Sequence, residues 1–337
     1  MRLLLFFLFL APACSALLAQ GSPKLRYDYT QRDPLAGHAP QTWLTPADEF
    51  NKSRFYTSVG IGTGTYAAFG IGLYSIWYKD YELEGFHTFN DWPEWQQMDK
   101  AGHFFTAYFF SRSAFAGLRW AGLKRPAARY AALGVANLLQ GTIETLDGYS
   151  SEWGFSLSDM GANLAGSLVF TAQDVLWQEQ RILIKVNSDL RRPPDVPVTN
   201  GQGQQSNLGY IDRERFGDNP FERFLKDYNA QTIWVSVNPA SFRPHSRLPQ
   251  WLNIAVGYGV EDVYGAYYNT WQDNGGGFGY RNDARRRQWY LSPDIYLSRI
   301  PTKKRWVRLA LGILDFVKVP APALEYSRGK FYGRWLR

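Results

Sequence analysis

Three apolar segments in the first half of the chain each carry a pair of polar side chains at helical spacing. The pairs are Asp99 and His103, Glu144 and Asp147, and Asp159 and Asn163. Residues three or four apart lie on one face of a helix. Because carboxylates and imidazole are costly to bury without partners, we expect the three pairs to converge on one place. The predicted polar cluster comprises Asp99, Lys100, His103, Glu144, Asp147, Asp159 and Asn163.

The segments around these pairs predict four apolar helices. An uncharged run of 24 residues, 55–78, suits a transmembrane or deeply buried helix, and its GIGTG stretch (60–64) indicates close helix packing. Three further helices are predicted over roughly 97–120, 127–147 and 157–180. Internal charges such as Arg112 leave membrane helices and a buried bundle as alternatives.

The second half of the chain has a different pattern. Strands are predicted where β-branched and aromatic residues gather, over 232–237, 251–258, 263–268 and 288–300, with a turn at 274–279 and a short amphipathic helix at 306–316. The predicted fold class is therefore α+β, with an N-terminal bundle of about four apolar, membrane-associated helices followed by a small antiparallel β-rich domain. In chain order we expect a signal peptide (1–19), an extended arm (20–52), the helical domain (53–187), a Pro- and Gly-rich linker (188–206) and the β-rich domain (207–337).

The first residues predict export to the cell envelope, either the periplasm or the outer membrane. Arg2 precedes a short apolar run, and small residues near Ala19 offer a cleavage site. Lipidation of Cys14 is the alternative, although Ala11 stands where a large aliphatic residue is expected. Cys14 is the only cysteine, so cleavage after Ala19 excludes disulfides and thiolate metal sites from the mature chain.

Composition narrows the classes of partner. The net charge is +7, yet no basic stripe with groove-reading motifs is visible, and no strand precedes the glycines at 60–64, so neither nucleic acid nor a nucleotide is expected. Aromatic residues make up 17% of the chain, with 21 Tyr and 13 Trp, and such rings are enriched at membrane interfaces as well as in aromatic-rich cores. The expected partners are membrane lipid or envelope proteins.

Several short motifs carry a family resemblance. They are Asp99-Lys100 with His103-Phe104, Glu144 with Asp147, Trp153-Gly154-Phe155-Ser156 ahead of Asp159, and Gly166. This region resembles the uncharacterised YfiM-like family of predicted periplasmic lipoproteins. It is distantly similar to VanZ-like membrane proteins, and the second half resembles the C-terminal extension of long Bacteroidetes-type members. The resemblance implies an envelope compartment and the polar cluster, but no reaction.

The chemistry of the polar cluster supports two hypotheses. An imidazole with several carboxylates is an oxygen-rich ligand set that suits magnesium, manganese, calcium or a catalytic zinc ion. A metal held by His103, Glu144 and Asp147 would lower the pKa of bound water, while Lys100 or Arg112 positioned an anionic group. The candidate catalytic residues are His103, Glu144, Asp147 and Asp159. Alternatively, the same residues form an internally satisfied network that only fixes the helix register.

Two functions follow from these alternatives. The leading hypothesis is an exported cell-envelope protein of structural or lipid-binding type, with no certain cofactor. The second is a metal-assisted hydrolase or transferase that acts on a lipid or cell-wall precursor.

Overall fold

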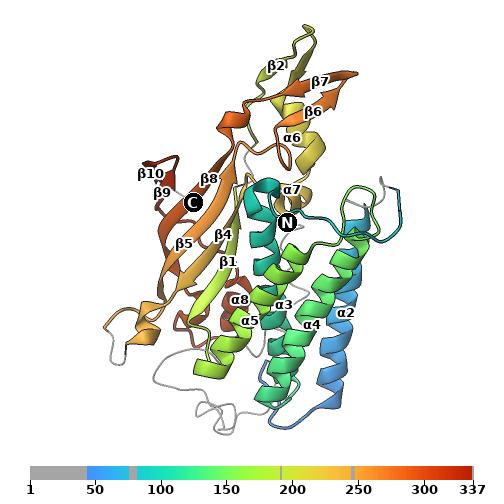
Figure 1. Ribbon diagram of the computed structural model, residues 1–337. Helices are drawn as coiled ribbons and strands as arrows, with labels where there is room; N and C mark the ends of the chain where they lie inside the picture. The colour runs from blue at the N-terminus through green and yellow to red at the C-terminus, as the bar shows by residue number, and fades with distance from the viewer. Residues whose placement is uncertain (1–43, 76–81, 190–191, 244–246, 336–337) are drawn as a thin grey trace.

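The structure is a computed structural model that describes residues 44–75, 82–189, 192–243 and 247–335 (Figure 1). Helices make up most of its first half, and the second half is built around an antiparallel sheet, so the α+β class is confirmed. The predicted signal peptide, Cys14 and most of the predicted arm lie outside the described residues.

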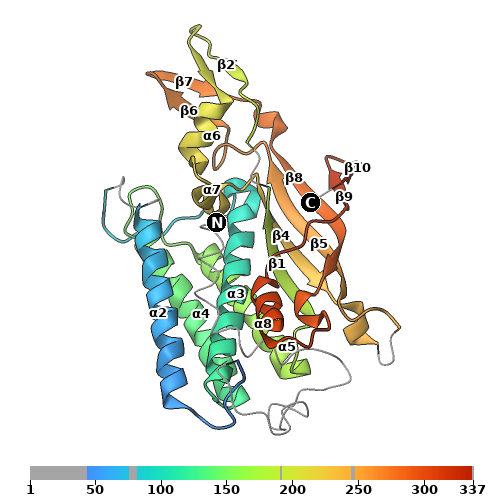
Figure 2. The ribbon, with the colours of Figure 1, turned by 180° about the vertical axis from the view of Figure 1, so that it is seen from behind.

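Four long helices form one side of the molecule. They are α2 (Lys52–Leu73), α3 (Met98–Trp120), α4 (Arg125–Asp147) and α5 (Leu157–Trp177). In both ribbon views α3 lies in the centre, with α4 and α5 packed on it and the sheet on its other side (Figures 1 and 2). The three helices predicted after residue 97 are therefore confirmed to within a few residues at each end.

Local sequence explains where these helices begin. The Asn51 side chain accepts a hydrogen bond from the backbone N–H of Arg54 at 3.0 Å and so caps α2. Ser156 caps α5 in the same way, accepting from the N–H of Asp159 at 3.0 Å. Pro126 stands in the first turn of α4, where its fixed φ suits a helix start and its missing N–H costs nothing.

Gly166 allows α3 and α5 to cross at very short range. A Cβ atom at this position would lie 2.0 Å from the carbonyl oxygen of Phe104, so any other residue would force the helices apart. The close crossing brings the face of α3 that carries Lys100 and His103 against the start of α5. The polar residues of the two helices therefore meet because a small residue stands between them.

The apolar run at 55–78 differs from its prediction in two respects. It forms α2, but Arg54 is the only buried residue of that helix, so the helix is not deeply buried. The prediction of close packing at Gly60, Gly62 and Gly64 is wrong, because a Cβ atom at each would meet nothing within 4 Å. Within the described residues, no helix combines the length and the apolar character that crossing a membrane requires. Residues 76–78 of the run lie outside the described residues.

The main sheet has six antiparallel strands in the order β1-β4-β5-β8-β9-β10. Their bounds are β1 (Ile182–Ser188), β4 (Gln231–Val237), β5 (Leu252–Glu261), β8 (Arg286–Ile295), β9 (Ala323–Ser327) and β10 (Lys330–Arg334). Two hairpins stand at one end of the sheet, formed by β2 (Pro197–Thr199) with β3 (Gln205–Asn207) and by β6 (Thr270–Asp273) with β7 (Gly276–Gly279). The shorter helices are α6 (Leu208–Phe216), α7 (Pro220–Lys226) and α8 (Arg305–Leu314), and the last of these was predicted.

The strand predictions were partly wrong. β1 pairs with β4 but lies almost wholly in the domain predicted to be helical, and the predicted linker (188–206) contains all of the β2–β3 hairpin except Asn207. Residues 263–268 do not form a strand, because the Asn269 side chain holds their backbone: its amide donates to the carbonyl of Asp262 and its oxygen accepts from Tyr264 N. The predicted turn at 274–279 is shorter than expected, with left-handed Asn274 and Gly275 joining β6 to β7.

Helices and sheet share one hydrophobic core. Tyr108 and Phe115 of α3 pack edge-on against Phe170 of α5, and the same cluster includes Ile184 of β1 and Ile233 of β4. This shared core places the sheet directly behind α3.

Candidate functional site

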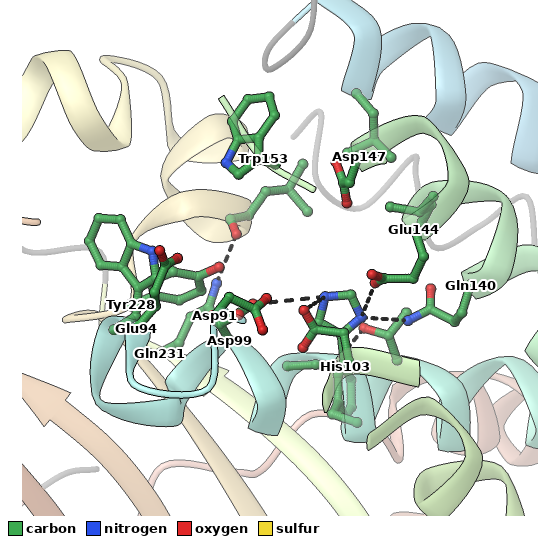
Figure 3. Close-up of a pocket in the computed structure, with 18 of the residues that line it drawn as sticks. Asp91, Glu94, Asp99, His103, Gln140, Glu144, Asp147, Trp153, Tyr228 and Gln231 are labelled. Atoms are coloured by element: carbon green, nitrogen blue, oxygen red, sulfur yellow. Dashed lines mark hydrogen bonds and ion pairs between the residues drawn. The ribbon is translucent and has the colours of Figure 1, made fainter. Parts of the chain in front are cut away.

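The predicted polar residues lie on three neighbouring helices that meet beside one cavity (Figure 3). α3 supplies Asp99, Lys100 and His103, α4 supplies Gln140, Glu144 and Asp147, and α5 supplies Asp159 and Asn163. His103 stands between α4 and α5, and hydrogen bonds or ion pairs link its ring to both helices.

The Nδ1 side of His103 faces two oxygens. Asn163 Oδ1 lies 3.2 Å from Nδ1, and Glu144 Oε1 lies 3.5 Å from it. The Gln140 side-chain amide is 3.4 Å from Nδ1 but only 2.7 Å from Asn163 Oδ1, to which it donates. These acceptors assign the ring proton to Nδ1, and they leave the lone pair of the neutral ring on Nε2.

The Nε2 side of His103 faces two carboxylates. Asp99 Oδ1 and Asp159 Oδ2 each lie 3.8 Å from Nε2. This separation exceeds that of a hydrogen bond. Asp99, His103 and Asp159 are the group of described residues whose ligand atoms all lie within 4.8 Å of one another, as donors to a single ion would.

Lys100 holds the carboxylates from the other side. Its Nζ lies 2.6 Å from Asp99 Oδ2, 3.0 Å from Asp159 Oδ1 and 2.7 Å from Asp91 Oδ2. Asp91 in turn accepts hydrogen bonds from the hydroxyl groups of Ser156 and Ser158. One buried ammonium group therefore orients three carboxylates, and Asp99 has its second oxygen free to face His103.

The pKa values of the site reflect burial first and neighbouring charges second. Burial raises the pKa of Glu144 to about 7 and that of Asp159 to about 8. Burial alone would lower the pKa of His103, but the nearby carboxylates of Asp159, Asp99 and Glu144 outweigh it and raise that pKa. Lys100 behaves in the same way. The acidic residues around the cavity also outnumber the lysine and histidine of the site; they are Asp91, Asp99, Glu144, Asp147 and Asp159.

The cavity beside His103 has a volume of about 290 Å³ and a mixed lining. Asp99, His103, Glu144, Asp147 and Asp159 form its polar wall, as Figure 3 shows for most of them. Its apolar wall includes Phe69 and Leu73 of α2, Trp95, and Trp153. Residues far along the chain close it, among them Tyr228 and Gln231.

The metal set differs from the prediction based on sequence. We predicted His103, Glu144 and Asp147, whereas the structure groups His103 with Asp99 and Asp159. Glu144 lies on the Nδ1 side of the ring, and Asp147 lines the cavity one turn further along α4. Arg112, considered for an anionic group, instead forms a buried ion pair with Asp315 at 3.1 Å.

Sequence reasoning missed several residues of the site. Gln140 stands four residues before Glu144, so helical spacing could have revealed it. Asp91 precedes the first helix of the site and carried no periodic signal. Tyr228 lies between α7 and β4, and Gln231 is the first residue of β4. Both follow Asp159 by more than 60 residues, and nothing local connects them to the cluster.

Comparison with known proteins agrees with the envelope prediction. Residues 84–173 match the family described as Predicted periplasmic lipoprotein (DUF2279). No curated protein and no solved structure matches the chain. The likeness to VanZ-like proteins and the long Bacteroidetes-type form are outside this match and stay predictions. The interval 84–173 includes every helical residue of the site, and its match to the predicted periplasmic lipoprotein family DUF2279 supports the family resemblance and confirms the predicted cell-envelope localisation.

Proposed function

We propose that this exported envelope protein binds a divalent cation through Asp99, His103 and Asp159, and uses it in hydrolysis or group transfer on a lipid or cell-wall precursor. One observation carries the proposal: His103 Nε2 faces Asp99 Oδ1 and Asp159 Oδ2 at 3.8 Å each without a hydrogen bond to either. Ligand atoms that share one ion at about 2.0–2.2 Å lie roughly 3–4 Å from one another.

The surrounding contacts support this ligand set. Metal-binding histidines typically donate their other ring N–H to an oxygen that fixes the tautomer, and here Asn163 Oδ1 is that oxygen. Lys100 fixes Asp99 and Asp159 by direct contact. The excess of carboxylates over positive charges gives a divalent cation a favourable place to bind.

The residues around the ligand set suit acid–base chemistry. A bound divalent cation supplies Lewis acidity to a phosphoryl or acyl oxygen. Glu144, with a pKa of about 7, would accept and release a proton close to neutral pH from the cavity wall. The cavity, with one polar and one apolar wall, would accept a substrate that has both an anionic group and an apolar part.

Cation binding to the full chain tests the proposal. We expect Mn²⁺ to bind at about one ion per chain, measured by the loss of the free-ion electron paramagnetic resonance signal. His103→Gln and Asp159→Asn should weaken binding at least about tenfold. Asp147→Asn is the matched control, because Asp147 lines the same cavity outside the ligand set, and it should bind Mn²⁺ as the unmodified chain does.

Two results would overturn the proposal. One is the absence of saturable binding of both Mn²⁺ and Zn²⁺ by the unmodified chain. The other is unchanged binding in His103→Gln, provided that thermal unfolding shows each variant to be folded.

A structural or lipid-binding role is the second candidate. It is favoured by the outward faces of α2, α4 and α5, whose exposed residues are almost entirely uncharged. That role does not require a cation.

A further inference from the structure

The polarity of α4 and α5 is the reverse of that in a water-soluble helix. In α5 the buried residues include Asp159, Asn163, Gln173 and Asp174, and the charged residues of both helices lie at buried or half-buried positions. The exposed residues of α5 carry no charge and are Leu157, Gly161, Leu164, Ala165, Leu168, Ala172, Val175 and Leu176. A surface helix in water has its polar face outward.

α4 follows the same arrangement. Arg129, Gln140 and Glu144 are buried, and Arg129 forms an ion pair with Asp174 of α5 at 2.6 Å. Its exposed residues are again uncharged and comprise Pro126, Ala127, Tyr130, Ala131, Gly134, Val135, Leu138, Thr142, Thr145 and Leu146. The side chain of Leu138, for example, is 67% exposed.

α2 extends this surface. It lies beside α4, where the Tyr66 hydroxyl donates to the carbonyl of Leu139 at 2.9 Å (Figure 1). Among its residues 52–73, Lys52 at the first position is the only exposed charge. Three adjacent helices thus present uncharged faces away from the sheet, and a continuous exposed apolar surface is typical of an interaction site.

Aromatic residues mark the two ends of this surface. Exposed Tyr56 and Tyr130 lie near the beginnings of α2 and α4, and exposed Tyr74 and Tyr149 lie directly after their ends. Tyr74 follows Tyr56 by 18 positions, or about 27 Å along a helix. Tyrosine is enriched where a protein surface passes from hydrocarbon to water, so these rings mark both borders of the uncharged surface.

We propose that lipid acyl chains cover the outward faces of α2, α4 and α5. An interface with a second copy would not require exposed tyrosines at both ends of the uncharged surface. The contact is one-sided, since the inner faces of α4 and α5 carry charges and pack on α3. Phe69, Leu73 and Ile143 of α2 and α4 also line the cavity, so the lipid-facing helices form part of its wall.

Spin labels on the full chain, reconstituted in vesicles of phosphatidylethanolamine and phosphatidylglycerol, test the lipid contact. Each label is placed on a single cysteine in a Cys14→Ser background, at Leu138→Cys or Leu168→Cys. Tyr268→Cys is the control, because Tyr268 is 65% exposed in a loop beyond β5. Lipid-facing labels collide readily with molecular oxygen and rarely with a water-soluble nickel chelate, whereas the control label should collide readily with the chelate.

The outcomes separate the possible occupants. For each label, the measured quantity is the ratio of its collision rate with oxygen to its collision rate with the chelate. The proposal is supported if this ratio is at least fivefold higher for the labels at 138 and 168 than for the control label. Low collision rates with both reagents indicate a protein interface, and high rates with the chelate indicate water; either result overturns the proposal. Measurement with and without EDTA separates this result from the cation-binding proposal, because the lipid contact uses none of the proposed ligands.

Discussion

Glu144 shows how strongly position controls the chemistry of a single side chain. Its side chain is almost fully buried, with Oε1 at 3.5 Å from His103 Nδ1 and Oε2 at 3.4 Å from the backbone N–H of Ser156. These two contacts do not offset the loss of water, because burial raises its pKa to about 7 from an ordinary value of 4.5. Between pH 4.5 and pH 7, Glu144 therefore keeps its proton in the folded chain, whereas in the unfolded chain it has released it.

This difference predicts a pH dependence of stability. Between pH 4.5 and pH 7 the folded state binds more protons at Glu144 than the unfolded state does, so its contribution to the free energy of unfolding falls as pH rises. For the unmodified chain in the presence of EDTA, the free energy of unfolding should fall by an amount on the order of 3 kcal/mol over this range because of Glu144. Glu144→Gln should abolish this fall, because the amide does not titrate. Urea unfolding of both proteins at pH 5 and pH 8 measures it.

The same experiment separates the two hypotheses for the polar cluster, a metal or catalytic site and a structural network, because they predict different effects of Glu144→Gln. If ionised Glu144 were a net stabilising member of a structural network, Glu144→Gln would lose about 3–5 kcal/mol at pH 8. Parallel pH profiles for the variant and the unmodified chain would contradict the expected shift.

The crossing of α3 and α5 decides whether the polar residues meet at all. Gly166 and Gly161 lie on the same helix but in opposite environments: a Cβ atom at Gly166 would strike the backbone of Phe104, whereas one at Gly161 would meet nothing within 4 Å. Sequence spacing places both on a helix, but only the packing separates their roles.

Alanine at these two glycines gives a matched pair of variants. Gly166→Ala should destabilise the chain by at least about 1–3 kcal/mol, since the helices must separate to accept the methyl group. Gly161→Ala should stabilise it by about 0.5–1 kcal/mol, because alanine restricts the unfolded chain and favours the helix. Urea midpoints measure both changes. Equal effects of the two substitutions would contradict the close crossing.

The molecule as a whole depends on buried ion pairs between its helical and sheet-forming parts. Arg112 of α3 pairs with Asp315, which follows α8, and both are almost fully buried. Asp315 Oδ1 also accepts from Leu297 N at 2.8 Å, and Asp315 Oδ2 accepts from Ser298 Oγ at 2.7 Å. The last part of the chain is thereby tied to the central helix.

Removing the cation of this pair tests the coupling. Arg112→Met leaves buried Asp315 with Lys185, whose Nζ lies 3.4 Å from Oδ1, so we expect a loss of about 3 kcal/mol in the free energy of unfolding, the low end for a broken buried pair. The double variant Arg112→Met/Asp315→Leu should regain part of it. Unfolding followed by tryptophan fluorescence and by circular dichroism should remain one transition. A loss below 1 kcal/mol in the single variant would show that the pair contributes little.

Local patterns were sufficient for the long helices and weaker for the sheet. The helices around His103, Glu144 and Asp159 were predicted within a few residues, because apolar residues recur at helical spacing over more than 20 positions. Strand β1 was missed because its seven residues, ILIKVNS, show no regular alternation of apolar and polar side chains and come shortly after a long helix. β9 and β10 were missed because each has only five residues, too few to establish a pattern.

The sequence by itself determined the α+β class, the helices and the residues that would need partners inside them, because helical spacing and the cost of burying charge are local properties. Only the tertiary structure decided which atoms face one another. It placed Asp99 and Asp159 on the Nε2 side of His103, and Glu144 on the other side. It also brought Tyr228 and Gln231 to the cavity. Ring orientation and distant contacts depend on how helices cross and strands pair, and helical spacing along the chain contains no information on either.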